Sequence, residues 1–418
     1  MKRELCFAPT SNQERIVSLD IIRAIALFGI LLVNMKFFST PTLQAEMANV
    51  SFSTTLADEI SQWFIFIFAE FKFISMFSLL FGIGFLVFME RGERRGANVK
   101  KIFVRRLLFL LCVGLFHMFF LWYGDILTFY ALLGFVLLIV RFKSPKFLLK
   151  ATFMTMMIPV LFFLLLAVLL AFVSPTTTTD QANYLSFSEV QTVVEIYGGG
   201  SYKEIFMQRL QEIGMILVGN IFVLAVVLSM FFFGMYLWKT GIFTKTQEQI
   251  DRVRKIARNS FLIGVVGLVL AIVGKLLYAG GDSPWYFVQY AGLFVSGPSL
   301  SVFYIMCILL LLQNKRRLAS VAQVLQPVGK MALTNYLMQT ILCTFIFYSY
   351  GLGLFGKIGP FYGLLFTVMI FLLQIGYSFL WMKRFAFGPM EWLWRNVTYG
   401  MSTEKLRMNK QVDQSVER

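Results

Sequence analysis

The sequence predicts an all-α polytopic membrane protein with about ten transmembrane helices and with both ends in the cytoplasm. Hydrophobic residues make up 58% of the 418 residues and charged residues only 14%, whereas about a quarter of a soluble domain is charged. Apolar runs of about 20 residues recur along the whole chain, and each is long enough to cross a bilayer as a helix. Such continuous runs exclude a transmembrane β-barrel, whose strands read as short alternating segments.

Ten apolar runs form the predicted spans. They lie at 19–38, 62–90, 103–123, 125–141, 147–173, 214–238, 260–280, 286–313, 331–350 and 360–382. If the N-terminus is inside and the spans alternate, 31 of the 38 Lys and Arg residues fall in inside segments, which predicts that both ends are cytoplasmic. The net charge of +16 then comes from basic loops facing lipid headgroups, so membrane lipid is an expected partner and nucleic acid is not.

The longest outside segment divides the predicted spans into two sets of five. We therefore expect five regions: a cytoplasmic tail at 1–18, an N-terminal five-helix half at 19–173, an extracytoplasmic loop at 174–213, a C-terminal five-helix half at 214–382, and a cytoplasmic tail with an interfacial helix at 383–418. An odd number of spans in each half would make the halves inverted, as in several transporter folds.

The first span, "SLDIIRAIALFGILLVNM", carries charges near its cytoplasmic edge. Asp20 and Arg23 are three residues apart, so they can pair across one helical turn. The pair is either an anchor at the membrane edge or a contact for a substrate, and the sequence leaves both open. Asn34 lies near the outer end of the same span and is a further candidate substrate contact.

The second run, 62–90, is too long for one upright helix. Its 29 residues would extend about 43 Å against roughly 30 Å of hydrocarbon. Glu70 and Lys72 lie within it, and residues two apart do not face each other on a helix. We therefore expect a tilt, a break near Glu70, or an interfacial lead-in helix that ends there.

The third and fourth spans contain the strongest candidate site. His117 is the only histidine in the chain, and it lies in an apolar run about 9 Å below the predicted outer end of its span. Gly124 permits a tight turn, and Asp125 then opens the fourth span, where a carboxylate suits the positive end of the helix dipole. Ionisable residues inside spans often mark function, although His117 can also be a neutral imidazole that only joins helices. Tyr130 is a further candidate contact.

The ninth span, "GKMALTNYLMQTILCTF", places two amides on one face. Asn335 and Gln339 are four residues apart, and such side chains either join helices by hydrogen bonds or contact a substrate. After the tenth span, "GPMEWLWR" predicts an interfacial helix with Pro389 in its first turn and Glu391 at its positive end.

Several common chemistries have no sequence support. The chain has no phosphate-binding loop of the form GxxxxGK[ST] and no dinucleotide-binding fingerprint. One histidine cannot form a His-pair metal site, and the four cysteines form no CxxC pair, so no bound metal is expected. No cofactor is expected to be permanently bound.

Five ordered blocks cover essentially the whole chain. They are "LDIIRAIALFGILLVNM", "KFISMFSLLFGIGF", "GLFHMFFLWYGDILTFYALLG", "GKMALTNYLMQTILCTFIFY" and "GPMEWLWR". Together they resemble the YeiB-like family of bacterial inner-membrane proteins, which implies a multi-pass protein of that membrane.

A more distant resemblance links the N-terminal half to membrane acyltransferases such as the lysosomal heparan glucosaminide N-acetyltransferase. It rests on the Asp-x-x-Arg and Val-Asn pattern of the first span, here Asp20, Arg23, Val33 and Asn34. It implies acyl transfer from cytosolic acyl-coenzyme A to an acceptor on the other side. In that enzyme the catalytic histidine follows the first span, but residues 39–60 contain none, so His117 would have to act instead.

Three functions are therefore compared. In the first, transmembrane acyl transfer, His117 is the base or acyl carrier, Asp125 or Glu70 orients it, and substrate contacts come from Asp20, Arg23, Asn34, Lys72, Tyr130, Asn335 and Gln339. The second is a secondary transporter or exporter of a small solute, and the third is a non-catalytic membrane scaffold. A slot from the basic cytoplasmic face to His117 would favour acyl transfer, and an inverted five-span repeat would favour transport. The substrate and the oligomeric state remain open.

Overall fold

A computed structural model describes residues 16–48, 50–94, 96, 98–172, 179–278 and 283–399. Its helices, apart from a short π-helical turn, run in the following order. They are α1 (Val17–Ser39), α2 (Thr42–Met47), α3 (Leu56–Phe68), α4 (Lys72–Arg94), α5 (Val99–Phe116), α6 (Leu127–Val140), α7 (Pro145–Ala171), α8 (Thr179–Gly199), α9 (Tyr202–Gly219), α10 (Ile221–Lys239), α11 (Ile250–Leu277), α12 (Pro284–Leu311), α13 (Lys315–Lys330), α14 (Ala332–Phe347), α15 (Pro360–Met382) and α16 (Pro389–Tyr399). Most of the predicted tails, 1–18 and 383–418, lies outside the described residues.

The all-α polytopic fold predicted from the sequence is confirmed. Among the described residues, eight helical segments are long and apolar enough to cross a membrane, with α3 and α4 together forming one of them. The two remaining predicted spans correspond to the shorter apolar helices α6 and α14. At about 1.5 Å per residue, α6 and α14 are only about 21 and 24 Å long, so neither alone matches the thickness of the hydrocarbon.

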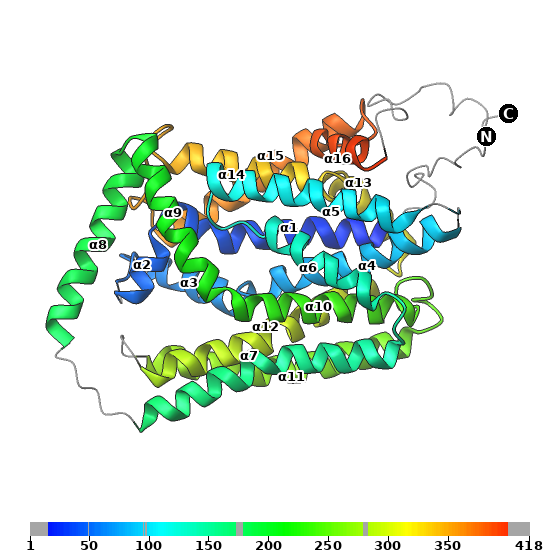
Figure 1. Cartoon of the computed structure of the whole chain (residues 1–418), viewed down its shortest axis with the longest axis horizontal. Helices are drawn as coiled ribbons and strands as arrows, with labels where there is room; N and C mark the ends of the chain where they lie inside the picture. Colours follow the sequence, from blue (N-terminus) through cyan, green and yellow to red (C-terminus); the bar gives the residue numbers. More distant parts are fainter. Residues whose placement is uncertain are drawn as a thin grey trace.

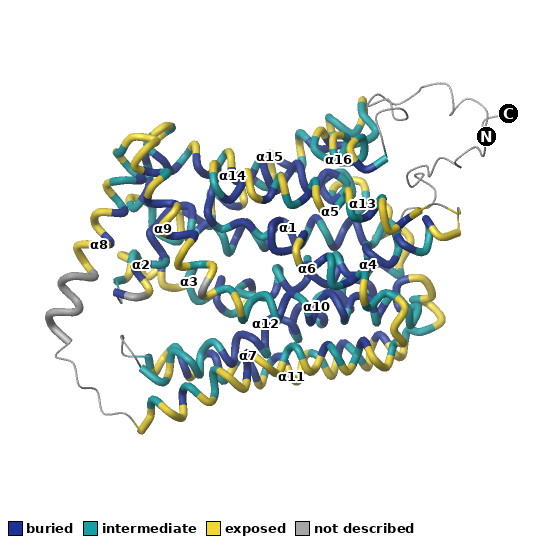
Figure 2. Tube along the Cα trace, viewed as in Figure 1, coloured by how far each residue is buried: buried dark blue, intermediate teal, exposed yellow. Residues whose placement is uncertain are grey.

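The helices lie side by side along one axis, with α1 in the middle of the bundle (Figure 1). Helix α1 packs against α4, α13, α14 and α15, and most of its residues are buried, as Figure 2 shows. Helices α7, α10, α11 and α12 form a second group, in which α11 and α12 pack closely along their length. Exposed positions run along α7 and α11, where apolar side chains such as Leu161 and Val266 face outward, as lipid contact requires.

The two ends of the bundle differ in charge. We call the end that holds the start of α1, the α10–α11 turn and α16 the basic end, because the segments there carry most of the Lys and Arg residues. Helices α2, α8 and α9 lie at the opposite end (Figure 1). The sequence-based prediction places the basic end in the cytoplasm.

The long second run contains a helix break, one of the three expected solutions. Helix α3 ends at Phe68 and α4 begins at Lys72, and Phe71 between them has a left-handed backbone with φ 61°. That conformation is uncommon for a residue with a side chain. Gly297 of α12 packs directly on it, because a Cβ at position 297 would lie 2.5 Å from the Phe71 Cβ. The close approach of α12 therefore holds the break in place.

The predicted outer segment forms two helices in its described part. Ser201 and Glu204 make a reciprocal capping box at the start of α9, which then continues to Gly219. The sixth predicted span was expected to begin at 214, but residues 214–219 belong to α9, and the apolar helix α10 begins only at Ile221. The capping box starts α9 well before the apolar run, and α9 then continues into that run. Hydropathy alone could therefore not locate the boundary between α9 and α10.

Candidate active site

His117 lies in the interior of the bundle and contacts two polar side chains. Its side chain is fully buried, and Nε2 lies 2.8 Å from the Thr340 hydroxyl oxygen. Nδ1 lies 3.0 Å from Asp125 Oδ1, and both of these side chains are inaccessible to solvent. The approach of Nδ1 to Oδ1 is at ion-pair distance without the straight geometry of a full hydrogen bond. The three residues form a continuous hydroxyl–imidazole–carboxylate chain, which we call the Thr340–His117–Asp125 triad.

The local backbone brings His117 and Asp125 together. Helix α5 ends at Phe116, and residues His117–Leu121 form a π-helical turn, which is a conformation often found at functional sites. The backbone of Trp122 is extended, and its backbone N–H donates to the backbone carbonyl of His117. The chain then reverses into α6, which packs back against α5. Asp125 consequently returns beside His117 although eight residues separate them.

Asp125 has two functions in this geometry. Its Oδ2 accepts a hydrogen bond of 2.7 Å from the Thr128 backbone N–H, so it caps α6 as the sequence suggested. Its other carboxylate oxygen faces His117. Capping fixes the orientation of the carboxylate, and the carboxylate held in this way lies 3.0 Å from the imidazole Nδ1.

Thr340 was not among the residues predicted from the sequence. It lies on α14, 223 residues from His117, and it is buried. Gln339, its neighbour, was singled out because its amide is costly inside a span, whereas a threonine hydroxyl can bond to its own helix and gives no signal. Only the packing of α14 against the π-helical turn that follows α5 identifies Thr340.

The triad has the arrangement of an activated nucleophile. A hydroxyl within hydrogen-bond distance of an imidazole, which is itself oriented by a carboxylate, is the signature of nucleophilic acyl transfer on several unrelated folds. The buried indole N–H of Trp122 has no hydrogen-bond partner among the described residues, and its ring lies edge-on to His117 at 6.3 Å between centroids.

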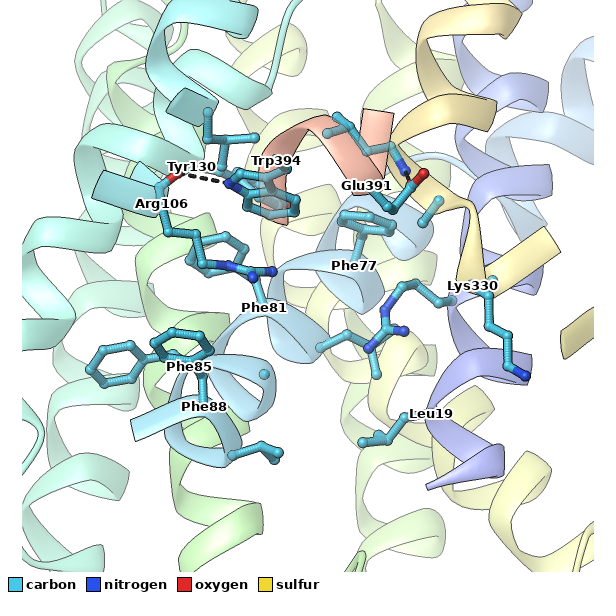
Figure 3. A pocket seen from close by; sticks show the side chains of 18 of the residues that line it. Leu19, Phe77, Phe81, Phe85, Phe88, Arg106, Tyr130, Lys330, Glu391 and Trp394 are labelled. Atoms are coloured by element: carbon cyan, nitrogen blue, oxygen red, sulfur yellow. Dashed lines mark hydrogen bonds between the residues drawn. The ribbon is translucent and has the colours of Figure 1, made fainter. Parts of the chain in front are cut away.

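A cavity of about 320 Å³ reaches into the bundle from the basic end. Basic residues dominate the charged part of its lining, which includes Arg23, Arg91, Arg106, Lys330 and Arg395. Farther in, the lining is apolar and aromatic, with Phe77, Phe81 and Tyr130 among its residues (Figure 3). We call it the inner cavity.

The inner cavity ends next to the triad. Ile126, Leu127 and Tyr336 line its inner part, and Ile126 directly follows Asp125. The Tyr336 ring lies 5.2 Å from the His117 ring, between centroids. Tyr336 and Thr340 are four residues apart, so they lie on the same face of α14 one turn from each other. The Tyr336 side chain is therefore the barrier between the cavity and the triad.

Helix α16 forms part of the cavity wall. The Trp394 indole N–H donates to the Arg106 carbonyl, and the Arg106 guanidinium lies 3.7 Å from the centre of the Trp394 ring (Figure 3). The sequence predicted that the Glu391 carboxylate stabilises the start of its own helix, but it also contacts a second helix. It accepts bonds from the N–H groups of Leu333 and Thr334 and thereby caps α14, the helix that carries Thr340.

Three of the predicted substrate contacts line the inner cavity. Arg23 donates to Asp20 at 2.7 Å, so the predicted pair forms, and both side chains line the cavity. The Tyr130 hydroxyl lies 2.6 Å from Ser78 Oγ, and the tyrosine also lines the cavity. The anchoring role and the substrate-contact role of the pair are therefore compatible.

Glu70 and Lys72 lie elsewhere, so of the two carboxylates expected to orient His117 only Asp125 lies beside it. The Glu70 carboxylate is 3.0 Å from Lys36 Nζ in a different cavity, which none of the triad residues lines. Lys72 is fully buried, and its ammonium donates to the Phe66 carbonyl at the end of α3. The helix break places Glu70 beside Lys36 of α1 and Lys72 against the end of α3, which sequence spacing could not show.

The other predicted contacts serve mainly to join helices. The Gln339 amide donates to Gln374 at 2.9 Å and to the Leu27 carbonyl, which links α14 to α15 and α1. The Asn335 amide donates to the Val328 carbonyl and to Ser378. Asn34 is half-buried on α1. The helix-joining interpretation therefore accounts for the hydrogen bonds of both amides.

Comparison with known proteins identifies relatives along the whole chain. Residues 237–401 match the family described as "Protein of unknown function (DUF418)". The chain is 37% identical over 410 residues to the Bacillus subtilis (strain 168) protein named "Uncharacterized protein YxaH", covering 94% of this chain and 96% of that protein. It is 28% identical over 411 residues to the Escherichia coli (strain K12) protein named "Uncharacterized protein YeiB", covering 92% and 96%.

Proposed function

The chain belongs to the YeiB-like family of multi-pass membrane proteins, and we propose that it transfers an acyl group within the membrane from a cytosolic thioester, acyl-coenzyme A, to an acceptor on the other side. The observation that carries the proposal is the inner cavity, which leads from the basic end to Tyr336, whose ring lies against His117 of the Thr340–His117–Asp125 triad. Bacterial relatives and long apolar helices support the bacterial inner membrane as the location.

The shape and charge of the inner cavity suit this donor. Arginine side chains at the mouth match the phosphates of coenzyme A, because guanidinium groups bind phosphate oxygens in pairs. Arg106 and His117 are eleven residues apart along α5, a distance of roughly 16 Å. An extended phosphopantetheine arm has thirteen bonds from phosphorus to sulfur, and at about 1.2 Å of advance per bond it spans roughly the same distance. Phosphates at the mouth would thus place the thioester at the inner end.

The proposed first step forms an ester on Thr340. The Thr340 hydroxyl oxygen attacks the thioester carbonyl carbon while His117 Nε2 accepts the hydroxyl proton. The C–S bond then breaks, and the thiolate of coenzyme A leaves with the proton from His117. In the second step a hydroxyl or amine of the acceptor attacks the ester, His117 again carries the proton, and the Thr340 hydroxyl is restored. Asp125 orients the imidazole throughout and stabilises its protonated form.

Tyr336 sets the access to the triad. Its ring separates the cavity from His117, so rotation of this one side chain would join the thioester to the Thr340 hydroxyl. The acyl group would then occupy the space now filled by the ring. A short acyl group such as acetyl is therefore the expected cargo.

The test is transfer of label from radioactive acetyl-coenzyme A to the purified protein. We expect wild-type protein to retain one acetyl ester on the peptide that contains Thr340, detected after denaturation by radioactivity and by mass spectrometry. His117→Gln keeps the size and some hydrogen bonding of the imidazole but removes the base, so labelling should fall by about a hundredfold or more.

The possible outcomes separate the three functions. Wild-type protein that neither retains nor transfers label would rule out acyl transfer. If proton-coupled solute flux in vesicles is then lost with His117→Gln, the protein is a transporter. If His117→Gln matches wild type in both assays, the histidine only joins helices, as a scaffold would require.

A further inference from the structure

A second cavity, of about 350 Å³, lies at the end of the bundle opposite the basic end. It is formed between the end of α1, α2, α3, the end of α11, and the starts of α12 and α15. We call it the outer cavity. None of the triad residues lines it, and it shares no lining residue with the inner cavity. The acyl-transfer proposal therefore leaves it without a function.

One side of the outer cavity carries a net negative charge. The Lys36 ammonium lies 3.0 Å from Glu70 and 3.4 Å from Glu46, so a single cation is shared between two carboxylates. The Glu46 side chain is 43% exposed, and its other oxygen accepts a bond from the Tyr290 hydroxyl. Glu46 is thus held in place by Lys36 and Tyr290 while it stays accessible to a ligand in the cavity.

The other charged group of the cavity is an ammonium. Lys275 of α11 lies over the rings of Phe66 and Trp63, at 4.6 and 5.4 Å from their centres. Within the described part of the chain, Lys275 Nζ makes no hydrogen bond and has no carboxylate oxygen at ion-pair distance. Lys36 Nζ in the same cavity has two carboxylate oxygens at that distance. Glu70 and Glu46 act on Lys275 only from beyond contact distance, so its ammonium can still contact an anionic group that enters the cavity.

The helix break makes this arrangement rigid. Glu70 lies in the break between α3 and α4, next to Phe71, whose backbone is held by the close approach of Gly297. Lys72 bonds to the end of α3 from the other side of the break. Glu70 therefore lies on supported backbone, and through Lys36 it helps to hold Glu46 in place before a ligand enters.

We propose that the outer cavity binds a zwitterionic amine, a small group that carries both an ammonium and an anionic phosphate or carboxylate. The ammonium of the ligand would contact Glu46, and its anionic group would contact Lys275. The four charged side chains of the cavity sum to zero, so a ligand with no net charge and two separated charges is favoured over a simple anion or cation. Either a free solute or the headgroup of an ethanolamine phospholipid has this chemistry.

Calorimetry with the full-length protein in a non-ionic detergent tests this proposal. The probe is glycerophosphoethanolamine, a phosphodiester with one negative and one positive charge, and ethylamine and dimethyl phosphate each carry only one of its charges. We expect glycerophosphoethanolamine to bind at least about tenfold more tightly than either single-charge probe, since each charge-assisted bond contributes on that scale. Lys275→Gln and Glu46→Gln should each weaken its binding by about tenfold or more, whereas Lys275→Arg should retain most of it.

Lys203→Gln is the matched control. Lys203 is an exposed lysine at the same end of the molecule that does not line the cavity, so this variant should bind like wild type. Native mass spectrometry distinguishes a lipid headgroup from a free solute as the ligand. It compares retention of phosphatidylethanolamine with retention of phosphatidylglycerol, which has no ammonium group. Retention of phosphatidylethanolamine without binding of the soluble probe assigns the site to lipid, and binding of the soluble probe assigns it to a free zwitterion.

Two results would overturn the proposal. One is that neither the soluble zwitterionic probe nor phosphatidylethanolamine binds, and the other is that wild type and Lys275→Gln bind equally well. Unfolding midpoints of all variants show whether a loss of binding reflects a loss of folding. Acetyl labelling of Thr340 is measured separately, so this test stands whether or not acyl transfer is found.

Discussion

At the scale of single residues, the proposed chemistry depends on the hydroxyl group of Thr340. Thr340→Val keeps the shape of the side chain but removes the nucleophile and one partner of His117. We expect acetyl labelling to fall by about a hundredfold or more with Thr340→Val and to persist with Thr340→Ser. The measurement is the rate of labelling with acetyl-coenzyme A.

Thr344→Val provides the control for that substitution. Thr344 lies one turn farther along α14 and is also buried, and its hydroxyl donates to the Ile341 carbonyl of its own helix and hydrogen-bonds with Tyr350, away from the triad. It should keep wild-type labelling. If both valine variants lose labelling equally, the effect would come from the packing of α14, and Thr340 would not be the nucleophile.

Glu212, outside the membrane-spanning helices, predicts a pH dependence of stability. Burial raises the pKa of this carboxyl group from 4.5 to about 7, although bonds from Tyr197, Gln208 and Gln44 act in the opposite direction. The neutral acid is therefore favoured in the folded state. Its contribution to stability is complete below pH 4.5 and is lost as the pH rises to about 7, and it amounts to about 3 kcal/mol at most.

Glu212→Gln isolates this contribution. Glutamine stays neutral at every pH and can still accept the hydrogen bond of the Tyr197 hydroxyl. We expect the variant to match wild type near pH 4.5 and to be more stable than wild type at pH 8, as measured by the unfolding midpoint across that range. Arg209 is the nearby cation that opposes the shift, so a parallel pH profile for the two proteins would mean that Arg209 keeps Glu212 ionised throughout.

At the scale of helices, α4 and α10 meet through a pair of glycines. A Cβ at Gly82 would lie 2.1 Å from the Phe231 carbonyl oxygen, and a Cβ at Gly234 would lie 2.1 Å from the Leu79 carbonyl oxygen. Each glycine thus receives the backbone of the other helix, as small residues do between membrane helices. Phe231, beside this contact, packs its ring against Phe81 and Tyr130 of the inner-cavity lining.

Gly82→Ala should therefore separate α4 from α10 and lower the free energy of unfolding by about 1–3 kcal/mol. The measurement is the thermal unfolding midpoint of the detergent-solubilised protein, which should fall. Gly84→Ala is the matched control on the same helix, because a Cβ there has nothing within 4 Å. An equal loss of stability in both variants would attribute the effect to the helix itself and not to its contact with α10.

The helices were largely predictable from the sequence, and the contacts between them were not. An apolar run of about 20 residues is a local property, so every predicted span has a matching helix. The excess length of 62–90 also predicted the break at Glu70 as one possibility. The partners of Glu70 and His117 were out of reach because Lys36 and Thr340 lie 34 and 223 residues away, and the fold alone brings them together.

At the scale of the whole molecule, the excess of basic residues at one end predicts the topology. Reporter fusions at residues 190, 250 and 418 should report the outside, the inside and the inside of the cell. Residue 190 lies on α8 at the end opposite the basic end, and residue 250 begins α11 at the basic end. A cytoplasmic signal at 190 would reverse the orientation and would place the mouth of the inner cavity outside.

The positions of charge along the inner cavity also have a bioenergetic consequence. Its basic residues lie toward the mouth, and the lining beyond Arg106 toward Tyr336 is uncharged. Carrying one elementary charge across the full membrane potential costs about 2.3 kcal/mol per 100 mV. A donor whose phosphates stop at the mouth sends only its neutral arm into the field and avoids that cost. Acyl transfer would then be electroneutral, and it would run equally fast in respiring cells and in cells whose membrane potential has collapsed.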